Sequence, residues 1–159
     1  MRFLLTLIFL AEPLAAHPHS KVEQQVILSI GLDRVALSIR IVPLYEEGEE
    51  VFAHLDLDGN GTISEAEALS FGGGMISETD FAIDGSKTVF ENLSVTTPDS
   101  HSVASGEGMI EAKVDARFPE LHSAEHGISF SISYEELLHG WFVQPFFFGE
   151  VQKAFRKQV

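Results

Sequence analysis

Four segments alternate apolar and polar residues with a period of two, and this pattern restricts the fold more than any other feature. Residues 21–31 and 34–42 each place apolar residues on one side, and the short connection at 31–33 fits a hairpin. Residues 109–118 and 128–134 repeat the pattern. Because successive side chains of a strand point to opposite faces, the four segments are predicted strands of an antiparallel sheet with one wet face.

A helical pattern interrupts the strands at residues 46–55. Four glutamates there precede an apolar spacing typical of a helix, and acidic residues in a first turn favour the helix dipole. A second helix is predicted to start near Glu65 and to end by residues 72–74, because three consecutive glycines destabilise a helix. The sequence therefore predicts an α+β fold: a small antiparallel sheet or sandwich with a helix–loop–helix inserted at about residues 46–72.

Three other segments have simpler patterns. Residues 81–89 contain an Asp-Gly turn between strand-like runs, residues 96–107 have the composition of a loop, and residues 150–159 fit a short helix. The apolar stretch 141–148 is predicted to be a core or edge strand, because Pro145 is confined to an edge or a bulge. An exposed docking site for a membrane partner or another subunit is the alternative.

The loop between the two predicted helices, residues 56–67, carries oxygen-bearing side chains at regular positions. Asp56, Asp58 and Asn60 stand at positions 1, 3 and 5, and a glycine follows at position 6, where the chain must turn sharply. Thr62 at position 7 offers its backbone carbonyl, Ser64 at position 9 can hold a ligand water, and Glu67 at position 12 can supply two carboxylate oxygens. This arrangement suits a hard cation that takes six to eight oxygens.

This loop resembles that of the EF-hand family, which implies calcium as its ligand. The resemblance covers residues 47–71, and every constrained position is filled. Residues 80–91 fit the same pattern poorly and are predicted to be a hairpin, since Ala82 stands where a ligand belongs. A single loop without a partner is expected to bind calcium weakly, with a Kd of roughly 10⁻⁴–10⁻³ M as in extracellular modules.

The N-terminal residues predict export. Arg2, an apolar run and small residues near position 16 form the pattern of a signal peptide over residues 1–16, which leaves 17–159 as a single mature domain. The expected location is the periplasm or the exterior, with no membrane span after cleavage. The mature chain would begin His17-Pro18-His19, and His17 would offer an amine and an imidazole together, which makes His17 and His19 candidate ligands for Cu(II).

The order of a His-Pro-His start, early strands, an aspartate loop and more strands is similar to that of small bacterial periplasmic EF-hand proteins near metal-transport systems. That resemblance implies an alternative function, a transition-metal (Cu/Ni/Co) handling accessory protein that uses His17 and His19. It also suggests a membrane transport component as the unknown protein partner. The main expectation is a calcium-binding protein in which the ion is structural and supports partner binding.

Charge and composition exclude several classes of function. The formal net charge is -14, which repels nucleic acid and anionic lipid, and the absence of cysteine excludes disulfides and thiolate metal sites. His122, Glu125 and His126 match the H-x-x-E-H pattern of one class of zinc peptidases. However, the segment is too short for the helix which that chemistry needs. We therefore expect a solvated loop and no enzymatic activity.

Overall fold

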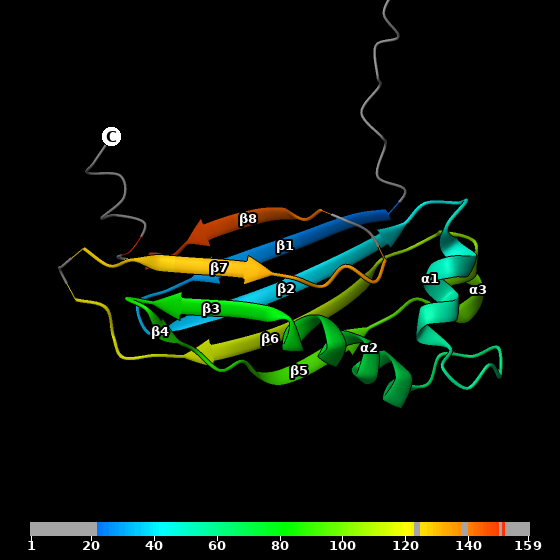
Figure 1. Cartoon of the computed structure of the whole chain (residues 1–159), viewed down its shortest axis with the longest axis horizontal. Coiled ribbons are helices and arrows are strands. Elements are labelled where there is room, and N and C mark those ends of the chain that lie inside the picture. The colour runs from blue at the N-terminus through cyan, green and yellow to red at the C-terminus, as the bar shows by residue number, and fades with distance from the viewer. Residues whose placement is uncertain (1–21, 123–124, 138–139, 150, 152–159) are drawn as a thin grey trace, which may run out of the picture.

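The computed structural model describes residues 22–122, 125–137, 140–149 and 151 (Figure 1). These residues form strands and helices in an α+β arrangement, as the sequence predicts. In chain order they are β1 Val22–Ile30, β2 Arg34–Pro43, α1 Gly48–Leu55, α2 Glu65–Ser77, β3 Thr79–Ile83, β4 Ser86–Lys87, β5 Glu91–Thr96, α3 Ser100–Ala104, β6 Ile110–Arg117, β7 Ile128–Ile132 and β8 Phe142–Phe147.

The strands form two sheets that lie one in front of the other in Figure 1. The larger sheet has the order β5-β6-β2-β1-β8, and the smaller one has the order β4-β3-β7. All neighbouring strands run antiparallel except β1 and β8, which are parallel. The predicted antiparallel sheet is therefore correct for seven strands, while β8 makes the larger sheet mixed.

The alternation seen in the sequence decides which face of the larger sheet is buried. The even residues of β1, the odd residues of β2 and the even residues of β6 point into one core, together with residues of α1, α2 and β3. Phe81 of β3 lies with its ring centroid 6.4 Å from that of Phe118, which follows β6, so aromatic contacts join the two sheets. Burial of this apolar surface is the main stabilising term of the fold.

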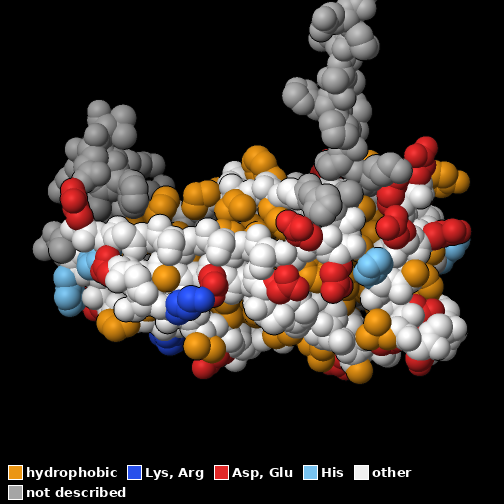
Figure 2. Space-filling model, in the orientation of Figure 1, with side chains coloured by type: hydrophobic (Ala, Val, Ile, Leu, Met, Phe, Trp, Pro, Cys, Tyr) orange, Lys and Arg blue, Asp and Glu red, His pale blue; other side chains and the backbone are white. Residues whose placement is uncertain are grey.

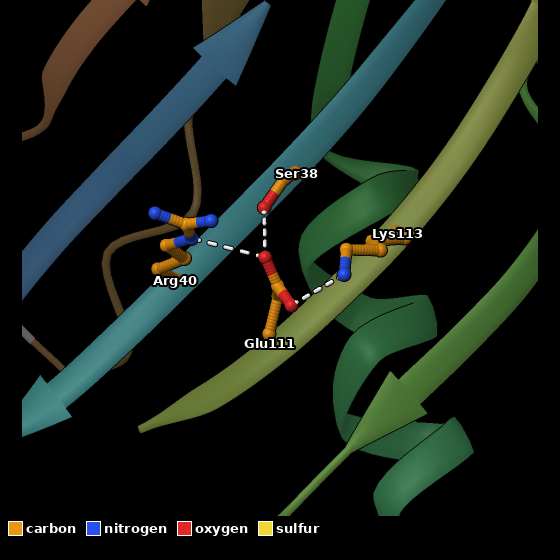
Figure 3. Close-up of polar contacts among 4 residues, drawn as sticks. All are labelled: Ser38, Arg40, Glu111 and Lys113. Carbon is orange, nitrogen blue, oxygen red and sulfur yellow. Dashed lines mark hydrogen bonds and ion pairs between the residues drawn. The ribbon is translucent and has the colours of Figure 1, made fainter. Parts of the chain in front are cut away.

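The opposite face of the larger sheet holds a cluster of charged and hydroxyl side chains from β2 and β6 (Figure 3). Glu111 Oε1 accepts hydrogen bonds from Ser38 Oγ at 2.7 Å and from Arg40 Nε at 2.9 Å. Its Oε2 lies 2.6 Å from Lys113 Nζ. Glu111 is only 8% exposed, so its neighbours compensate a charge that has lost most of its water.

Helix α2 continues through the three glycines, so the predicted helix end at residues 72–74 is wrong. The helix runs to Ser77 because its glycine face packs closely on the larger sheet. A Cβ at Gly72 would lie 2.5 Å from Val95 Cγ2 and 3.4 Å from Ala112 Cβ. Phe71 and Met75 on the same helix are buried. Tertiary packing therefore outweighs the low helix propensity of glycine.

The segment predicted as a loop at residues 96–107 contains the short helix α3. Asp99 caps this helix, since its Oδ1 accepts a hydrogen bond from the backbone of Ser102 at 3.0 Å. The prediction missed the helix because only five residues have helical structure. Figure 1 shows α3 beside α1 at one end of the molecule.

Strand β8 lies at the edge of the larger sheet, so the edge strand predicted for the apolar stretch 141–148 is confirmed. The Phe148 N–H donates to Ile30 O of β1 at 3.0 Å, so by alternation the nitrogen of Pro145 faces outward. A proline fits there because no ladder hydrogen bond is lost. Phe142 is 64% exposed, and Phe146 and Phe148 are also exposed.

Several predicted features lie outside the described residues. These are the signal peptide at 1–16, the histidines His17 and His19, and most of the helix predicted at 150–159. Within the part of the chain that the structure describes, no helix is long and apolar enough to cross a membrane.

Candidate metal centre

Two helices hold the ends of the loop at residues 56–67. Asp56 is the C-cap residue of α1, and its N–H bonds to Phe52 O at 2.9 Å. Ser64 is the N-cap residue of α2, where it forms a capping box with Glu67: the Glu67 N–H donates to Ser64 Oγ, and Glu67 Oε2 accepts from Ser64 N–H. The end of α1 therefore positions Asp56, and the start of α2 positions Glu67, at the first and last positions of the loop.

Three carboxylates converge inside this loop. Oxygens of Asp56, Asp58 and Glu67 all lie within 4.8 Å of one another. No other group of three or more His, Asp or Glu side chains is this close within the described ranges. Carboxylates at such distances repel one another unless a cation or hydrogen bonds compensate the charge.

Backbone N–H groups supply part of that compensation. Asp56 Oδ2 accepts a hydrogen bond from Gly61 N at 2.8 Å, and Asp58 Oδ1 accepts one from Asn60 N at 3.1 Å. Asn60 Oδ1 in turn accepts from Thr62 N at 2.8 Å. Gly61 has a φ of +83°, a conformation that favours glycine, so the chain turns at position 6 as the pattern predicts. The side-chain oxygens at positions 1, 3 and 5 thus share the interior of one turn.

Glu67 is the most buried of the predicted ligands. It is 8% exposed, and its Oε1 accepts a hydrogen bond from Leu57 N at 2.9 Å. The backbone and side-chain hydrogen bonds from Ser64 are the main reason that the pKa of Glu67 lies below its ordinary value, and further backbone bonds from Asp58 and Leu57 add to the effect. The carboxylate is therefore held in the charged form that a cation requires.

The middle of the loop is tied to α3. The backbone N of Ile63, at position 8, donates to Ser100 Oγ at 3.0 Å, and the Ile63 side chain packs against the core. Sequence reasoning did not identify Ser100 as part of the site. The signal that could have found it is Asp99, a preferred N-cap residue, followed by a short helical turn.

The second candidate loop, at residues 80–91, folds as the predicted hairpin. Asp84 and Gly85 both have positive φ values between β3 and β4, which is the backbone of a tight hairpin turn. Lys87 Nζ lies 2.8 Å from both carboxylate oxygens of Asp80. The acidic side chain that would begin a second calcium loop is therefore paired with a lysine.

The H-x-x-E-H segment is only partly described, since residues 123 and 124 fall outside the described ranges. His122 and Glu125 are exposed, and the described residues of the segment have no helical structure. His126 Nδ1 pairs with Asp84 Oδ2 at 2.8 Å, and that hydrogen bond raises the pKa of His126. His126 thus fastens this segment to the β3–β4 turn.

Acidic side chains are prominent on the visible face of the molecule (Figure 2). Figure 2 shows Asp and Glu along the visible face and gathered at the end where α1 lies, whereas Lys and Arg appear in one small area. The whole chain has 24 acidic and 10 basic residues. Such a surface concentrates cations near the loop.

Comparisons with protein-family models, with curated proteins and with solved structures gave no match for this chain.

Proposed function

We propose that the chain binds one calcium ion in the loop at residues 56–67. The observation that carries the proposal is the convergence of the Asp56, Asp58 and Glu67 carboxylates in a loop that also fills the other EF-hand positions. Asn60 would add a side-chain oxygen, Thr62 a backbone carbonyl and Ser64 a water-mediated contact. Oxygen ligands of this kind suit a hard cation better than copper, nickel or zinc.

The ion's proposed role is structural. Asp56 ends α1 and Glu67 lies in the first turn of α2, so a cation between their carboxylates would link the two helices. Both helices send apolar side chains into the core shared with the sheets, among them Leu55 and Phe71. A bound cation would thus stabilise the end of the molecule where the loop lies.

A protein partner, in the periplasm or outside the cell, remains part of the proposal. The exposed residues Phe142 and Phe146 of β8, with Phe148 directly after it, supply apolar surface for such a contact. Exposed apolar patches often mark interfaces. Calcium at about millimolar concentration outside cells would match a loop with a Kd of roughly 10⁻⁴–10⁻³ M.

The direct test is calorimetric titration of the purified chain with calcium, alongside the variant Glu67→Gln. This variant removes one charge and one good oxygen ligand, so we expect affinity to fall by about tenfold or more. Glu65→Gln is the matched control, because Glu65 is exposed and stands two residues before Glu67 at a position that supplies no ligand. Equal affinities for wild type and Glu67→Gln would rule out the proposed site.

A further inference from the structure

Helix α3 contacts the middle of the loop at residues 56–67. The Ile63 N–H, at loop position 8, donates a hydrogen bond to Ser100 Oγ at 3.0 Å. Ser100 is the first residue of α3 and lies 37 positions further along the chain. The contact is therefore tertiary and independent of the loop's own hydrogen bonds.

The base of α3 is well anchored, so Ser100 has a defined position. Asp99 Oδ2 accepts a hydrogen bond from Ser102 Oγ at 2.7 Å, in addition to the backbone bond that caps the helix. Val103 on the same helix is only 1% exposed and belongs to the core. A hydroxyl held by an anchored helix loses less freedom when it accepts a hydrogen bond.

The same segment packs against the helix that enters the loop. A Cβ at Gly48, the first residue of α1, would lie 2.5 Å from Ala104 O and 2.7 Å from Val103 O. Gly106 has a φ of +71°, and a Cβ there would lie 2.6 Å from Tyr45 Cα. The backbones of residues 44–48 and 103–106 are therefore in direct contact, which only glycine allows at these two positions.

We propose that Ser100 is a positioning residue for the calcium loop and that α3 serves as the internal partner of this single EF-hand. Through Ser100 the segment holds position 8 of the loop, and through its glycine contacts it holds the start of α1. The inference rests on the proposed calcium site. Because coupling between two sites is reciprocal, α3 increases the affinity of the loop for calcium, and calcium increases the stability of α3.

Calcium titration of the variant Ser100→Ala tests this coupling. Loss of one hydrogen bond to a backbone N–H is expected to weaken calcium binding by about 3- to 10-fold. Ser100→Thr keeps the hydroxyl and should restore most of the affinity. Ser94→Ala is the matched control, because Ser94 is exposed on β5, outside both the loop and α3; its calcium affinity should equal that of wild type.

Hydrogen exchange of the wild-type chain gives a second readout that does not depend on any variant folding. Calcium should slow exchange at the amides of Ile63, Val103 and Ser105, the last two of which donate within the α3 segment. Unchanged affinity in Ser100→Ala, or no calcium-dependent protection in α3, would overturn this inference while leaving the calcium site intact. A wild-type chain that binds no calcium would overturn both.

Discussion

At the scale of single residues, Glu111 has the most perturbed environment on the outer face of the larger sheet. Burial raises the pKa of its carboxyl group, but the hydrogen bonds from Lys113, Ser38 and Arg40 outweigh burial and lower the pKa to about 2. These partners come from two paired strands, β2 and β6, with Arg40 directly opposite Glu111 in the register (Figure 3). The cluster thus couples the charge of Glu111 to the alignment of the strands.

This low pKa predicts how stability depends on pH. In the unfolded chain Glu111 takes up a proton near pH 4.5, whereas the folded chain keeps it charged down to about pH 2. The contribution of the charged Glu111 side chain to the free energy of unfolding is therefore complete above pH 4.5 and is lost as the pH falls toward 2. Denaturant unfolding should show Glu111→Gln less stable than wild type at pH 7, with the difference shrinking at pH 3.

The control for that experiment is Glu91→Gln, which removes one negative charge from an exposed position on the neighbouring strand β5. If the free energies of unfolding of wild type and Glu111→Gln differ by the same amount at pH 7 and at pH 3, the proposed charge network is contradicted.

At the scale of elements, α2 shows how packing can reverse a reliable local rule. Gly72 and Gly73 are adjacent in one helix, yet they face different surroundings. A Cβ at Gly72 would meet Val95 at 2.5 Å, whereas at Gly73 the nearest atom would be Leu93 Cδ2 at 3.9 Å. The first glycine permits close approach to the sheet, and the second has ordinary space around it.

The two positions predict opposite effects for the same substitution. Gly73→Ala should stabilise the fold by about 0.5–1 kcal/mol, because alanine favours the helix and meets no close atom. Gly72→Ala forces a methyl group against Val95 and should destabilise by about 1–3 kcal/mol from overpacking, less the gain in helix propensity. Thermal unfolding of both variants measures the contrast. Equal melting temperatures would show that the contact at Gly72 is not tight.

At the scale of the whole molecule, calcium should stabilise the fold by mass action. With a Kd of roughly 10⁻⁴–10⁻³ M, 10 mM calcium contributes about 1.4–2.7 kcal/mol. For a domain of this size the melting temperature should rise by about 3–10 °C. Differential scanning calorimetry with calcium, magnesium or chelator measures the shift. The proposal fails if Glu67→Gln shows the same rise as wild type.

The continuation of α2 also changes what the loop implies for the whole molecule. The sequence predicted a shortened exit helix, but α2 is 13 residues long, and both helices bury apolar side chains in the core. An opening of the two helices would expose Leu55, Phe71 and Met75, which are now buried. The proposed structural role of the ion is therefore supported by the burial of these side chains and not by a shortened exit helix.

Local patterns in the sequence predicted most strands, both loop-flanking helices and the candidate ligand residues. Alternation identifies the buried face of a strand without reference to its neighbours, and the spacing from Asp56 to Glu67 brings oxygens together within one turn. The tight turn at Asp84 and the edge position of Pro145 were predictable for the same reason, because each depends on backbone geometry within a few residues.

Tertiary structure alone decided the features that depend on residues distant in sequence. Gly72 remains helical because Val95 and Ala112 lie against it, and β8 pairs in parallel with β1 although more than a hundred residues separate them. Ser100 reaches Ile63 only because α3 docks beside α1. No short pattern encodes such contacts, since their energy comes from surfaces that meet only after the sheets have packed.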